Sequence, residues 1–218
     1  MMNNRSMAQI IGEVERSTKL RVYSKKYSII SYIYENDEAS STSILANCPL
    51  ASSTFFASLQ DLKRSGIVRS RALSSAQVLR RYRLSDQTRA LIDSAYLSID
   101  RWMRSRLFAE GDREIAPIYA HVGFIEQSLN IRYYSIEFYI VIHLYEMVEA
   151  RATDVFSLGK YSSTSFYYTL KRLADMGILT CTADASDSRS KIYALSGHVR
   201  SVLDRAHRQI VDLGLLVN

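Results

Sequence analysis

The stretch FFASLQDLKRSGIV (residues 55–68) recurs 111 positions later as FYYTLKRLADMGIL (residues 166–179). Both stretches place an aromatic residue, two leucines and a glycine at the same spacing and end on two aliphatic residues. Phe55, Leu59 and Leu62 are spaced i, i+4, i+7, which predicts one apolar stripe on an α-helix. Gly66 follows the last turn, where glycine adopts the left-handed conformation that ends a helix at least cost. The chain is therefore predicted to contain the same packed helix twice.

The similarity between the two halves extends well beyond this helix. Identical residues pair at the constant offset of 111 along about 75 positions without a gap, which indicates an internal duplication. The pairs include Tyr23/Tyr134, Ser24/Ser135, Tyr34/Tyr145, Glu38/Glu149, Tyr82/Tyr193, Arg89/Arg200 and Asp93/Asp204. We therefore divide the chain into a first repeat, residues 1–110, and a second repeat, residues 111–218.

Each repeat predicts the same order of elements. In the first repeat we expect helices at 8–20, 25–36, 41–47, a helix capped by Ser52, strands at 67–71 and 80–84, and a helix at 86–108. In the second repeat we expect helices at 114–129, 135–148, 152–158, a helix capped by Ser163, strands at 178–182 and 191–195, and a helix at 197–214. This is the order of a winged helix-turn-helix, so the fold class is mainly α with small β-hairpin wings, in two repeats.

Composition and charge limit the function. The chain has 218 residues, 47% of them apolar, and carries a net charge of +6 with an isoelectric point near 9.3. Residues 1–110 hold a charge of +7 and residues 111–218 a charge of −1, so the first repeat favours an anionic partner. No apolar run reaches the roughly 20 residues of a membrane span, and the N-terminus resembles no leader, so we expect no membrane association and a cytoplasmic, nucleoid-associated location.

The sequence offers no pattern that is typical of an enzyme. Its four histidines do not have metal-ligand spacing, and we find no glycine-rich phosphate loop and no nucleophile elbow. We therefore expect neither catalysis nor a cofactor or metal.

The second repeat contains the helix sequence STSFYYTLKRLADMGILT (residues 163–180) and the hairpin sequence DSRSKIYALS (residues 187–196). The first resembles the recognition helix of the MarR-type transcription regulators, and the second resembles the wing of that family. The first repeat departs at the wing tip, where Ala76 and Val78 stand at the positions of Asp187 and Arg189. Two copies in one chain resemble the two-domain staphylococcal Sar regulators.

This resemblance implies a single-chain pseudo-dimer with two recognition helices about one DNA turn apart. The helices around 86–108 and 113–129 would form its body. The residues expected to pack there are Trp102, Leu107, Phe108, Ile115, Ile118 and Phe124. The resemblance also makes a small aromatic effector a candidate partner, and it leaves further association into homo-oligomers open.

The predicted DNA-binding residues lie on the helix faces opposite the apolar stripes and on the wings. The helix-face residues are Ser53, Phe56, Ala57, Gln60 and Arg64 in the first repeat, and Thr164, Tyr167, Tyr168, Lys171 and Arg172 in the second. The wing residues are Arg69, Arg71, Arg81, Arg83, Arg189 and Lys191. Hydroxyls, amides and cations suit base edges and phosphates, and the resemblance places Arg189 in the minor groove. A solvated helix face, a protein interface and a plain basic hairpin are the alternatives.

Together these features predict a sequence-specific regulator of transcription that binds double-stranded DNA. A plasmid replication initiator is the first alternative, because initiators also pair two winged helices. A protein-interaction scaffold is the second, although such scaffolds tend to be acidic and the first repeat is basic. A scaffold would not show the steep loss of DNA affinity with rising salt that phosphate contacts produce.

Overall fold

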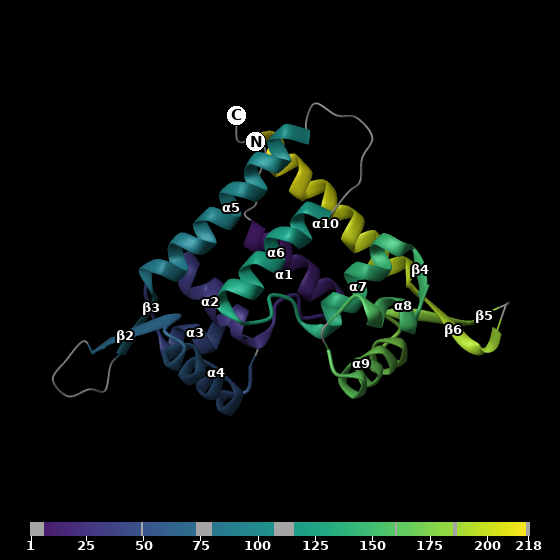
Figure 1. The fold of residues 1–218 in the computed structure, drawn as a ribbon, viewed down its shortest axis with the longest axis horizontal. Coiled ribbons are helices and arrows are strands. Elements are labelled where there is room, and N and C mark those ends of the chain that lie inside the picture. Colours follow the sequence, from purple (N-terminus) through teal and green to yellow (C-terminus); the bar gives the residue numbers. More distant parts are fainter. Residues whose placement is uncertain are drawn as a thin grey trace. The chain divides into compact units, whose positions relative to one another are not determined.

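The computed structural model describes residues 7–48, 50–72, 80–106, 116–159, 161–184 and 187–216, which form two compact units (Figure 1). The first-repeat unit is Tyr23–Tyr133, and the second-repeat unit combines Met1–Val22 with Tyr134–Asn218. These units are not divided at residue 110. The early helix of each repeat belongs to the unit of the other repeat, where it packs on the long closing helix.

The first-repeat unit is a winged helix. Its elements are α2 (Lys25–Asn36), β1 (Ala39–Ser40), α3 (Ser41–Asn47), α4 (Ser52–Arg64), β2 (Val68–Ala72), β3 (Arg80–Leu84), α5 (Asp86–Arg106) and α6 (Ala116–Leu129). The strands form an antiparallel sheet in the order β1-β3-β2. Helix α6 packs on α5.

The second-repeat unit has the same architecture. Its elements are α1 (Met7–Thr18), α7 (Ile136–Met147), β4 (Glu149–Arg151), α8 (Ala152–Ser157), α9 (Ser163–Asp175), β5 (Leu179–Asp184), β6 (Asp187–Leu195) and α10 (Gly197–Leu216). The sheet order is β4-β6-β5, and α1 packs on α10. The predicted fold class is confirmed. The hairpins were predicted, whereas the third strands, β1 and β4, were not.

The repeated helix packs as the stripe predicts. Phe55 and Leu62 on α4 are fully buried, and so are Phe166 and Leu173 on α9. Burial of a side chain of this size contributes about 1.5–3 kcal/mol relative to exposure, so each stripe is a main stabilising contact of its unit.

Both repeated helices end in the same hydrogen-bonded turn. Gly66 has a φ of 73° and Gly177 a φ of 69°. The Gly66 N–H donates to the Lys63 carbonyl at 3.1 Å, and the Ile67 N–H donates to the Leu62 carbonyl at 3.0 Å. The same two bonds recur after Gly177. This paired pattern satisfies carbonyls that the helix leaves without partners and needs a left-handed residue at the glycine position.

The predicted N-caps are wrong by one residue. Ser52 and Ser163 are the first helical residues, and the caps are Ala51 and Ser162. The Ser162 hydroxyl accepts from the Ser165 N–H at 3.3 Å, whereas Ala51 offers no side-chain acceptor. A run of adjacent serines gives several equivalent starting points, so the sequence alone did not choose between them.

Residues that are identical in the repeats tie each closing helix to the rest of its unit. The Tyr34 hydroxyl donates to Asp93 at 2.6 Å, and the Tyr145 hydroxyl donates to Asp204 at 2.7 Å. Burial, followed by the contact with Asp93, raises the pKa of Tyr34 well above its ordinary value. Arg89 adds a bond from its guanidinium to the Tyr34 carbonyl at 3.1 Å. The duplication has therefore kept a polar anchor as well as a core.

One predicted packing residue is exposed. Phe124 on α6 has 49% of its surface exposed, because Val122 and Ile125 form the buried side of that helix. The side chains of Trp102 and Ile118, and residues Leu107, Phe108 and Ile115, lie outside the described part of the chain.

Candidate nucleic-acid interface

The face of α4 opposite its buried stripe is exposed at every predicted position. These residues are Ser53, Phe56, Ala57, Gln60 and Arg64. Phe56 keeps 52% of its surface exposed although it is a large apolar side chain. The Arg64 guanidinium contacts Asp61 at 2.6 Å on the same helix, an exposed pair that contributes little to stability. The face therefore combines a hydroxyl, an amide, an aromatic ring and a cation.

Helix α9 presents a corresponding face. Thr164, Tyr167, Tyr168 and Lys171 are exposed, and Tyr168 has 70% of its surface exposed. Arg172 lies differently: its guanidinium forms an ion pair with Glu137 on α7, and that carboxylate is largely buried. The contact of Arg172 therefore helps to fix α9 on α7.

The first-repeat wing sheet has one apolar face and one basic face. Val68, Tyr82 and Leu84 are buried against the helices. The basic face carries four exposed arginines, Arg69, Arg71, Arg81 and Arg83. Arg69 lies directly opposite Arg83 in the ladder, and Arg71 lies opposite Arg81, so all four point away from the core.

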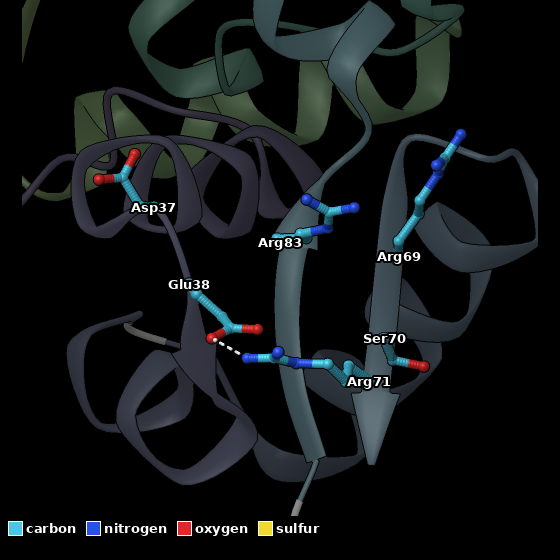
Figure 2. A pocket seen from close by; sticks show the side chains of 6 residues that line it. All are labelled: Asp37, Glu38, Arg69, Ser70, Arg71 and Arg83. Carbon is cyan, nitrogen blue, oxygen red and sulfur yellow. Dashed lines mark hydrogen bonds and ion pairs between the residues drawn. The ribbon is translucent and has the colours of Figure 1, made fainter. Parts of the chain in front are cut away.

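Carboxylates border this basic face, and the sequence did not predict their contacts. Glu38 accepts from Arg71 at 3.1 Å, a contact that Figure 2 shows crossing over β3. Asp86 lies 3.9 Å from Arg69 and 4.0 Å from Arg83, at the limit of an ion pair. We use the name arginine hollow for the surface cavity of about 530 Å³ between these groups. It is lined by Asp37, Glu38, Arg69, Ser70, Arg71 and Arg83.

The second-repeat wing is built differently. Lys191 is exposed on β6, whereas the side chains of Arg189 and Asp187 lie outside the described part. Arg151 on β4 contacts Asp184 on β5 through both Nε and a terminal nitrogen, each at 2.6 Å. Both contacts go to the same oxygen, Oδ2, and Asp184 is only 9% exposed, so this ion pair fastens the two outer strands of the sheet. Neither residue was predicted to have a role.

Other site types gain no support within the described residues. No group of three or more His, Cys, Asp or Glu side chains there could hold a metal ion. No described helix combines the length and apolar character needed to cross a bilayer.

Comparison with known proteins gives only distant structural similarity to MarR-family winged-helix regulators. No protein-family model matches the chain, and no curated protein matches it. A MarR variant from E. coli, solved with operator DNA, shares 14% identity and a TM-score of 0.33, covering 57% of this chain and 74% of that one. Reduced AbfR bound to DNA shares 18% identity and a TM-score of 0.32, covering 58% of this chain and 83% of that one. BpsR of Bordetella bronchiseptica shares 12% identity and a TM-score of 0.31, covering 60% of this chain and 83% of that one. Scores this low carry no functional conclusion for this chain.

Proposed function

We propose that the chain is a sequence-specific regulator of transcription that binds double-stranded DNA through α4 and α9. One observation carries the proposal. Each winged-helix unit holds one helix whose inner face is buried and whose outer face exposes hydroxyl, aromatic and cationic groups, to which α4 adds the amide of Gln60.

The exposed groups match the chemistry of a major groove. Thr164 and Gln60 offer donors and acceptors to base edges, and the rings of Phe56 and Tyr168 can contact thymine methyl groups. A large exposed aromatic side chain such as Tyr168 also indicates a partner, because water solvates it poorly. The same proposal includes Ser53, Ala57, Arg64, Tyr167, Lys171 and Arg172.

Contacts with the phosphate backbone would come from the wings. Arg69, Arg71, Arg81 and Arg83 of the first repeat, together with Lys191 of the second, provide a sequence-independent attraction. Arg189 is proposed for the minor groove. Each phosphate that a protein neutralises releases counterions, so the affinity must fall as salt rises.

Genomic footprinting with the native protein tests the proposal. We expect discrete protected sites with two half-sites, because the chain carries two recognition helices. Two double variants, S53A/Q60A and T164A/Y168A, should each lose occupancy at these sites. Ser201→Ala, an exposed change on α10, is the control. Equal occupancy for the native chain, the two double variants and the control would show that α4 and α9 do not contribute to DNA recognition. Absence of any salt-sensitive DNA binding would favour a scaffold.

The remaining expectations are part of the same proposal. A small aromatic effector should release the protein from its sites in a footprinting titration with aromatic acids. Sedimentation over a range of concentrations tests whether chains associate further.

A further inference from the structure

The arginine hollow lies on the outer face of the first-repeat sheet. The inner face of the sheet packs against α2 and α4 through Tyr82 and Leu84, so the arginines point away from both helices. Under the proposed function these arginines attract DNA phosphates without sequence preference. Their arrangement around one cavity is more specific than that role requires.

The fold does not require these arginines. Arg69 and Arg83 face each other across the ladder, and like charges directly opposite destabilise a sheet. The second repeat folds in the same way with Thr180 and Ala194 at the aligned positions. The first repeat therefore retains a repulsion between Arg69 and Arg83, which is typical of a site that binds an anion.

Two of the three guanidinium groups in the hollow have only a weak ion-pair partner. Glu38 positions Arg71 at 3.1 Å. Asp86 is the partner of both Arg69 and Arg83, but its contacts are 3.9 and 4.0 Å long and its side chain is 80% exposed. Exposed pairs at such distances contribute little. Figure 2 shows Arg69 and Arg83 extending toward the same end of the sheet. Because the Asp86 carboxylate lies 3.9 Å from Arg69 and 4.0 Å from Arg83, one anion can reach both groups.

We propose that the arginine hollow is a phosphate-binding site. Arg69 and Arg83 donate to the phosphate oxygens, and Arg71, positioned by Glu38, supplies a further donor. The planar fork of a guanidinium matches two oxygens of a phosphate group. The phosphate belongs either to a small free ligand or to a DNA backbone, and only the second source rests on the proposed function.

Calorimetric titration of the full chain with inorganic pyrophosphate at low ionic strength tests the site. We expect one saturable site per chain, weakened at least tenfold by R69T/R83A, which installs the residues of the second repeat. R101A/R208A removes two exposed arginines elsewhere and so matches the loss of charge. This control should bind pyrophosphate nearly as well as the native chain. Failure to reach saturation, or equal losses in the two variants, would overturn the site.

A second titration separates the two sources. With duplex DNA bound at saturation, a backbone site will no longer accept pyrophosphate, and R69T/R83A will also reduce the salt dependence of DNA binding. A site for a free ligand will bind pyrophosphate equally with and without DNA. If the chain binds no duplex at all, the proposed function fails, while the first titration still decides the phosphate site.

Discussion

The two wing sheets have the same strand arrangement and differ in the residues on their outer faces. The first sheet exposes Arg69, Arg71, Arg81 and Arg83. The second carries Thr180, Thr182, Ile192 and Ala194 at the aligned positions. The inner positions next to the helices, in contrast, are apolar and buried in both sheets, as Val68 and Leu84 with Leu179 and Leu195 show. The inner positions thus maintain the fold, and the outer positions were free to acquire separate chemistry.

The sheets are also fastened in different ways. Arg151 and Asp184 join the outer strands of the second sheet through an ion pair whose carboxylate is buried. The corresponding link in the first sheet, Glu38 with Arg71, is exposed and contributes little to stability. One wing is therefore braced by its ion pair, and the other presents its charge to the solvent.

The largest effect is expected from the two buried phenylalanines. Phe55→Ala and Phe166→Ala each remove a fully buried ring and should each lower the free energy of unfolding by about 3–5 kcal/mol. Urea denaturation followed by circular dichroism measures this loss, with the exposed change Phe56→Ala as the control. A cost in one unit that is several-fold larger than in the other would show that the two cores are not equivalent.

The helix-ending glycines should behave alike at a smaller cost. Gly66→Ala and Gly177→Ala place a side chain at a positive φ, which costs about 1–2 kcal/mol. No described atom lies within 4 Å of the added carbon at either site, so the backbone alone sets the cost. The same denaturation assay should give equal losses, and the exposed change Ser201→Ala is the control. A neutral result at either site would mean that its turn does not need the left-handed conformation.

Moving the arginines to the second sheet tests whether surface charge distinguishes the wings in DNA binding. T180R/A194R should steepen the slope of log affinity against log salt by up to about 1.8, since each new phosphate contact adds about 0.9. Fluorescence anisotropy with a labelled duplex measures the slope. T180Q/A194Q adds long polar side chains without charge and should leave it unchanged. Equal slopes for both variants would place this sheet away from the DNA.

The smallest effect concerns a histidine that only the second repeat carries. Burial lowers the pKa of His143 below 6.5, while Tyr32 occupies the aligned position of the first repeat. Protonation of His143 therefore favours the unfolded chain. The stability that its neutral form maintains is fully present above about pH 6.5 and is lost as the pH falls through the lowered pKa. Urea denaturation at several pH values should show that His143→Tyr reduces the acid sensitivity. An unchanged pH profile would assign that sensitivity to other groups.

The sequence predicted what depends on local periodicity. The bounds of α2 and α3 agree with the expected 25–36 and 41–47, and both glycine stops have the expected conformation. It did not predict β1 and β4, because two or three residues cannot establish an alternating pattern. Contacts that require the sheet register were also missed. Glu38 and Arg71, for example, are 33 residues apart and meet only once β1 has paired with β3.

The exchange of early helices has a consequence for the origin of the chain. Helix α1 completes the unit of the second repeat, and α6 completes the unit of the first. A polypeptide split between the repeats would give fragments that each lack a helix of their own unit, so the two should fold well only by complementation. A single-repeat ancestor with the same packing would have been an obligate homodimer in which each subunit donated its early helix to the other. Gene fusion would have linked the two subunits covalently without repacking either core.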